Sequence, residues 1–160
     1  MRKILLFIVL LFIACGSDNP KIQMYNYNVQ YVDFRWDEKK EMGQIDAVGA
    51  INAFRSFPFR EQQEKSKTLP EPTAPTLSFV SQSDGAILSV WSYEPDNYEL
   101  YLENEGEKVT VETKGESLIV ESINSFFAGS RKDLFNRLAS ESSAVTKRGF
   151  LNTIKSFFSG

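Results

Sequence analysis

The chain contains no histidine and only one cysteine, Cys15, among its 160 residues. Without histidine, neither a Ser-His-Asp triad nor a Cys-His pair can form, and imidazole is missing as a metal ligand. A single cysteine excludes a disulfide within the chain and a cluster of thiolate ligands. The sequence also lacks a glycine-rich phosphate loop, a nucleophile elbow and a calcium-binding loop. These absences predict a protein that is not an enzyme and that holds no metal or other cofactor.

The excess of one sign of charge over the other is small as well. There are 18 Lys and Arg and 21 Asp and Glu, which give a formal net charge of −3. So small an imbalance gives no indication of nucleic-acid binding. Apolar material is plentiful, since 13 Phe, 6 Tyr and 2 Trp can fill the core of one domain of this length. We therefore expect a single folded domain with no nucleic-acid partner.

One long apolar run, residues 4–14, follows the two cations Arg2 and Lys3 and directly precedes Cys15. At about 1.5 Å per residue the run covers roughly half of the ~30 Å hydrocarbon core of a bilayer, so it is too short to span it. A short positive region, an apolar run and a small residue form the plan of a secretory signal. Residues 11–16, LFIACG, resemble the lipobox of bacterial lipoproteins, with Phe12 at the position where Leu is typical.

This resemblance implies that residues 1–14 are a signal peptide, removed before a lipidated Cys15. Residues 15–21 then form a short polar tether, and residues 22–160 form the domain. Gly16 after the cysteine is similar to the default outer-membrane sorting signal of Gram-negative lipoproteins. We therefore expect a protein of the cell envelope, anchored by its lipid to the outer membrane and facing the periplasm.

Residues 76–113 carry the clearest structural pattern of the chain. Four short segments, 76–82, 86–93, 97–103 and 107–113, are separated by the turn sequences SDG, EPDN and NEG. Within each segment apolar and polar residues alternate, which gives one buried face and one wetter face. The pattern predicts a four-stranded antiparallel meander.

The flanking segments predict one further strand and several helices. Residues 22–36 alternate until the phase slips near Tyr31, which favours a strand; an exposed aromatic patch for a ligand such as a sugar is the alternative. Residues 37–67 have helical spacing broken at Pro58, and residues 59–65 are polar and expected to be solvated. Residues 117–129 and 131–138 are also helical in pattern. We predict an α+β fold, with the meander, which the N-terminal strand can join, covered on one face by helices.

Acidic residues and aromatic rings gather on the wetter face of the meander. Between Glu94 and Glu121 there are nine Asp or Glu against two Lys. Such a face can bind a basic protein partner, since complementary charge speeds encounter and aromatic rings supply contact area. A solubilising face that protects the sheet from aggregation is the alternative. We call the candidate residues the acidic-aromatic patch: Trp91, Tyr93, Glu99, Tyr101 and Glu103.

Two other segments offer weaker candidate sites. The C-terminal stretch is amphipathic, which favours packing on the protein's own core, and contact of its apolar residues with a membrane is the alternative hypothesis. These residues are Phe150, Leu151, Ile154, Phe157 and Phe158. Arg55 and Arg60, on either side of Pro58, can bind a carboxylate or phosphate, or lie on the surface of a kinked helix.

The leading functional hypothesis is a lipid-anchored, non-catalytic, periplasmic domain that binds another protein. The order of helix, meander and helices is loosely similar to small α+β immunity and inhibitor proteins, which implies a role of that kind. The alternative is a structural or accessory envelope lipoprotein, which docks onto a membrane complex through its C-terminal amphipathic helix.

Replacing Cys15 by Ser is expected to move the protein from the membrane fraction to the soluble fraction, because serine cannot carry the thioether-linked lipid. Fractionation of cells and detection of the protein in each fraction provide the measurement, with Ser17→Ala as the control that keeps the cysteine. A variant that stays with the membrane would show that the lipobox interpretation is wrong or that the C-terminal helix is an anchor of its own.

Overall fold

Six strands pair into one antiparallel sheet in the computed structural model, which describes residues 24–142. In spatial order they are β2 (Lys40–Ile45), β1 (Tyr25–Gln30), β3 (Thr76–Ser81), β4 (Ile87–Glu94), β5 (Asn97–Asn104) and β6 (Glu107–Lys114). The helices are α1 (Ala47–Ser56), α2 (Phe59–Ser66), α3 (Ser117–Phe127) and a further one over residues 131–142. The α+β class is confirmed, but the sheet has six strands rather than four.

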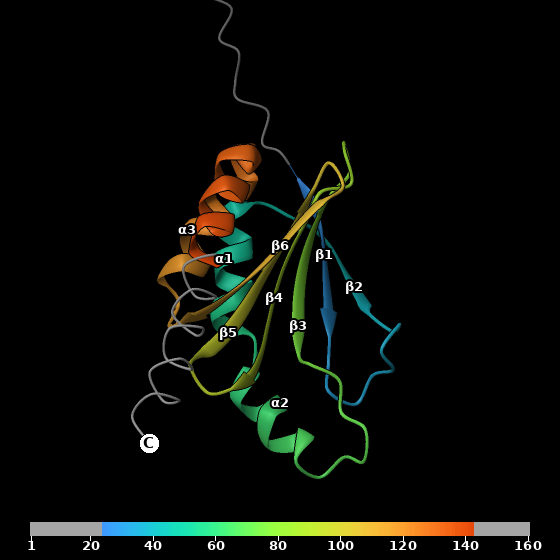
Figure 1. Ribbon diagram of the computed structural model, residues 1–160. Coiled ribbons are helices and arrows are strands. Elements are labelled where there is room, and N and C mark those ends of the chain that lie inside the picture. The colour runs from blue at the N-terminus through green and yellow to red at the C-terminus, as the bar shows by residue number, and fades with distance from the viewer. Residues whose placement is uncertain (1–23, 143–160) are drawn as a thin grey trace, which may run out of the picture.

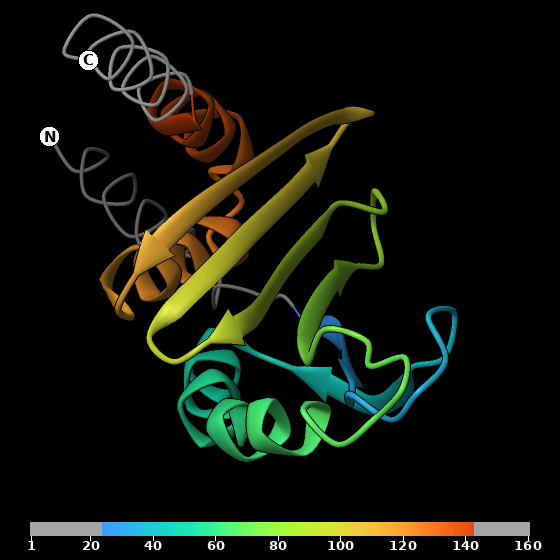
Figure 2. The same ribbon diagram turned by 60° about the horizontal axis from the view of Figure 1, so that its bottom comes forward.

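The helices α1 and α3 lie on one side of the sheet, and α2 lies at one end of the sheet (Figures 1 and 2). We call the side that faces the helices the inner face and the opposite side the outer face. Apolar residues of β3 to β6 alternate onto the inner face as predicted; Tyr98 is partly buried there, and the others are buried: Leu77, Phe79, Leu88, Val90, Leu100, Leu102, Val109 and Val111. They pack with Ile119, Ile123 and Phe126 of α3 in one core, where truncation of such a residue to Ala costs about 2–5 kcal/mol.

Residues 40–45 form a strand, β2, where the sequence pattern predicts the start of a helix. Gly43 has φ +96°, which lies outside the helical region, and it belongs to an irregular stretch of pairing with β1. Asp46 is extended and its Oδ1 accepts a hydrogen bond from Gly49 N at 2.7 Å, so the helix begins only at Ala47. The prediction of a helix from residue 37 onward is therefore wrong for residues 37–46, and Val48, which has helical spacing with Met42, is 68% exposed.

The predicted break at Pro58 is confirmed, because α1 ends at Ser56 and α2 begins at Phe59. The prediction that residues 59–65 are solvated holds only in part, for Arg60, Glu61, Glu64 and Lys65, which are exposed. Gln62 and Gln63 are buried, where Gln62 Oε1 accepts from Val32 N at 3.1 Å and Gln63 Nε2 donates to Ser92 Oγ at 2.7 Å. Each of these two amides forms one hydrogen bond with a neighbouring segment, while Gln63 Oε1 is buried without a partner among the described residues.

Gly129 ends α3 and redirects the chain into the last described helix. It has φ +79°, and its N–H donates to Phe126 O at 3.2 Å, while Ser130 N donates to Ser125 O at 3.0 Å. This pair of bonds is a Schellman motif, for which glycine is favoured. The turn places Arg131 at the start of the next helix, against the edge of the core.

Arg131 is 7% exposed and connects segments far apart in the sequence. Its Nη2 donates to Tyr25 Oη at 2.9 Å and to Ser81 Oγ at 3.2 Å, and its Nη1 pairs with Asp84. The guanidinium also lies over the Phe126 ring, 5.1 Å from its centroid. Burial raises the pKa of Asp84. Hydrogen bonds from Ser81, from a backbone N–H and from Arg131 lower the pKa by more than burial raises it, so the pKa of Asp84 lies below its usual value.

Replacing Arg131 by Ala is expected to lower the free energy of unfolding by about 2–3 kcal/mol, because Asp84 and Ser81 lose their partner. The loss stays below that of a fully buried pair because the Asp84 side chain is 46% exposed. Urea denaturation measures it, with Lys132→Ala as the control, whose exposed pair with Glu107 contributes at most about 1 kcal/mol. Equal losses for the two variants would contradict the structural role of Arg131.

Candidate functional site

The five residues of the acidic-aromatic patch lie on the outer face of β4 and β5. Trp91 is the cross-strand partner of Glu99, and the next pairs along β5 place Tyr101 and Glu103 on the same face. Ser92 points to the inner face, where it accepts a hydrogen bond from Gln63. Its neighbour Tyr93 therefore points outward, and it is 65% exposed. The structure thus brings together the residues that the alternation of the sequence groups.

Within the patch, aromatic and acidic side chains contact each other. The rings of Trp91 and Tyr101 lie 6.3 Å apart between centroids, inclined by 41°. Tyr101 Oη donates to Glu103 Oε2 at 2.5 Å, and Lys108 Nζ lies 3.6 Å from the same carboxylate oxygen. Burial and the hydrogen bond to Glu103 raise the pKa of Tyr101 to about 12. Tyr101 is therefore a protonated donor at neutral pH, and Glu103 is already engaged by two neighbours.

Glu112 adds to the patch a second carboxylate, besides Glu99, that forms no ion pair with a described residue. It lies on β6 directly opposite Glu99, so two like charges face each other across neighbouring strands. Neither forms an ion pair with a cation between residues 24 and 142. Like charges at such positions are unfavourable. The sequence pattern places Glu112 on the correct face, but the pairing with Glu99 follows only from the register of β5 and β6.

Much of the acidic run has cationic partners from distant parts of the chain. Glu107 pairs with Lys132, Glu116 with Arg55 and Glu121 with Arg137. The run is therefore not the uniformly negative surface that its composition suggests. On β5 and β6, Glu99 and Glu112 are the carboxylates that form no ion pair with a described residue, and they lie beside Trp91. Lys114, on the same face of β6, forms no ion pair with a described residue either.

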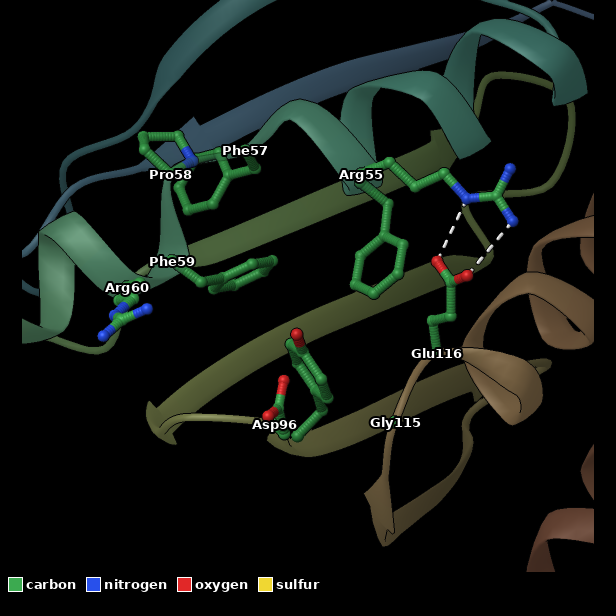
Figure 3. A pocket seen from close by; sticks show the side chains of 10 residues that line it. Arg55, Phe57, Pro58, Phe59, Arg60, Asp96, Gly115 and Glu116 are labelled. Carbon is green, nitrogen blue, oxygen red and sulfur yellow. Dashed lines mark hydrogen bonds and ion pairs between the residues drawn. The ribbon is translucent and has the colours of Figure 1, made fainter.

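Arg55 and Arg60 line a cavity of about 440 Å³ at the break between α1 and α2 (Figure 3). Arg55 donates from Nε to Glu116 Oε2 at 3.0 Å and from Nη2 to Glu116 Oε1 at 3.3 Å. Figure 3 shows that the two guanidinium groups point to opposite ends of the cavity. Among the described residues Arg60 forms no ion pair, so it alone remains available to an anion here.

The remaining predicted sites lie outside the described residues. These are Cys15, with the signal and tether, and the C-terminal residues Phe150, Leu151, Ile154, Phe157 and Phe158. Within residues 24–142 no helix is both long and apolar enough to cross a membrane. In that same part of the chain, no three carboxylate or thiol side chains are grouped to hold a metal ion.

Comparison of the chain with protein-family models, with curated proteins and with solved structures gives no match. The fold and the patch define the class of the protein as α+β, with one sheet face packed on helices and an outer face that carries exposed aromatic and acidic side chains.

Replacing Glu103 by Gln is expected to lower the pKa of Tyr101 from about 12 toward the ordinary value near 10, because an amide no longer disfavours the phenolate. NMR of tyrosine labelled with ¹³C at Cζ resolves the titration of each ring, and Glu94→Gln serves as the control. A Tyr101 titration that does not move would contradict the part assigned to Glu103.

Proposed function

We propose that this chain is a lipid-anchored, non-catalytic protein-binding domain of the bacterial cell envelope, facing the periplasm. Its acidic-aromatic patch, extended by Glu112, binds a basic segment of a partner protein. The observation that carries this proposal is the pair of facing carboxylates, Glu99 and Glu112, which has no cationic partner among residues 24–142 and lies beside Trp91.

The facing carboxylates are a feature that the fold itself does not require. The register of β5 and β6 is maintained by the buried pairs Leu100–Val111 and Leu102–Val109, so the glutamates add repulsion without adding order. A lysine or arginine from a partner removes this repulsion by pairing with both carboxylates. Stabilising residues are commonly given up at sites where binding benefits from the change.

The aromatic residues of the patch supply the rest of the contact. Trp91 lies next to Glu99 in the sheet, so a cation held by the glutamates lies within reach of the indole face. Tyr101 and Tyr93 extend the apolar area around it, and Tyr93 is exposed. Tyrosine and tryptophan are enriched in protein interfaces, and arginine is the cation that is enriched there with them. An immunity or inhibitor protein that covers a basic surface of its target is the specific form of this proposal.

Replacing both Glu99 and Glu112 by Gln is expected to stabilise folding and weaken binding. Removal of the repulsion raises the free energy of unfolding by a few tenths of a kcal/mol, measured by urea denaturation. Loss of both charges lowers partner affinity at least about tenfold, equivalent to about 1.4 kcal/mol. Glu71→Gln, an exposed acid outside the sheet, is the matched control and changes neither quantity.

Partner capture is measured with a photoreactive phenylalanine in place of Tyr93, and in place of Val48 on α1 as the control position. Crosslinking from position 93 is expected to be lost when Glu99, Tyr101 and Glu103 are replaced together, with the fold intact. Capture that persists in this triple variant, or that is equal from position 48, would refute the assignment of the patch.

A further inference from the structure

A second cavity, of about 360 Å³, opens on the outer face between the strands β1 and β3 and the loop of residues 31–39. Asn28, Thr76 and Ser78 line it from the sheet, and Trp36 to Lys39 line it from the loop. It adjoins the acidic-aromatic patch, because Thr76 is the cross-strand partner of Trp91. The patch does not use any of these lining residues.

The loop that forms the wall of this cavity is held in one conformation. Gln30 Nε2 donates to Arg35 O at 2.9 Å and to Trp36 O at 3.1 Å. At its base, Thr73 Oγ1 donates to Tyr31 O at 2.9 Å, and Lys65 pairs with Asp33 at 2.8 Å. A wall built in this way needs little ordering when a ligand binds, which favours affinity.

Trp36 is 83% exposed although its backbone is fixed by this network. An exposed aromatic ring is not a site by itself, since single apolar residues are common on protein surfaces. Here, however, the indole lies at the edge of a polar cavity. It offers a flat apolar surface beside hydrogen-bonding groups, and that combination is typical of ligand sites.

Asn28 is the second and independent observation. The ring of its neighbour Tyr27 stacks on Phe79 at the inner face, so the Asn28 side chain points to the outer face and into the cavity. Asn28 is only 7% exposed, yet its amide makes no hydrogen bond with any described residue. Among the described residues, the fully buried polar atoms that lack a partner belong to other side chains, so the Asn28 amide keeps contact with the cavity. Its two donors and its acceptor are therefore available to a ligand.

The charged lining residues narrow the chemistry of the ligand. Asp37 pairs with the Arg35 side chain, and Glu38 accepts from Arg35 N at 3.2 Å, so both carboxylates are engaged. Lys39 adds one positive charge to the lining, so neither sign of charge dominates and a strongly charged ligand gains little there. A purely apolar ligand would leave the Asn28 amide unsatisfied. The ligand that fits has hydroxyl groups that both donate and accept, together with an apolar ring face. A pyranose sugar has both features.

We propose that this cavity binds a neutral saccharide, with one pyranose ring stacked on Trp36 and its hydroxyls hydrogen-bonded to the Asn28 amide. The volume lies in the range of small-ligand sites, which is about 300–1,000 Å³. The proposal goes beyond the protein-binding function, because it uses different residues and a different class of ligand.

The experiment is a calorimetric titration of the full chain, purified in detergent, with three probes: maltotriose, cellotriose and chitotriose. At least one of them is expected to bind with a Kd of about 1 mM or tighter. Trp36→Ala is expected to weaken that binding at least about tenfold without changing the thermal unfolding temperature, because the side chain is exposed. Asn28→Asp, which keeps the size but removes the donors, weakens the same binding.

Met42→Ala is the matched control, an exposed apolar residue on β2 that does not line the cavity. It is expected to bind the saccharide as the unaltered chain does. The proposal is overturned if none of the three probes binds, or if Trp36→Ala and Asn28→Asp both bind as tightly as the control. The Glu99→Gln, Glu112→Gln double variant is expected to keep full saccharide binding, so failure here and failure of the protein-binding proposal are distinguishable.

Discussion

The contact of Arg131 with Tyr25, Ser81 and Asp84 is the interaction on which the arrangement of the layers depends. It joins the start of the last described helix to β1 and to the turn between β3 and β4. Tyr25 in turn donates to Phe126 O at 3.2 Å, which adds the end of α3 to the same contact. These contacts hold the Tyr25 end of β1, the strand that also carries Asn28 and lies between β2 and β3.

A single antiparallel sheet with helices on one side creates two chemically different surfaces. The inner face is buried with aliphatic and aromatic residues, and its packing maintains the register of the strands. The outer face does not pack against the helices and does not set the register, so it can carry groups that do not stabilise the fold. The facing carboxylates of Glu99 and Glu112, the exposed Trp36 and the unpaired amide of Asn28 all lie on this side. Both proposed binding sites are therefore consequences of one open sheet face.

Prediction from sequence succeeded where the pattern was local and failed where pairing decided the outcome. The meander from β3 to β6 was predictable because alternation and turn residues agree over four consecutive segments. β2 was not, since Met42, Ile45 and Val48 have helical spacing while Gly43 and the Asp46 cap exclude a helix before Ala47. The patch was predictable by face, but the position of Glu112 opposite Glu99 was not. Nothing in the sequence indicated that the nearly buried Asn28 amide has no hydrogen-bond partner among the described residues.

The sequence by itself determined which side chains of the meander share a face, and it excluded histidine from every site, because both depend only on residue identity and spacing. The tertiary structure alone decided which charges are neutralised, which carboxylates face each other and where the loop of residues 31–39 lies against the sheet. Those features depend on contacts between residues far apart in the chain, for example Arg131 with Tyr25. No local pattern encodes such a pairing, since it arises only when the elements pack together.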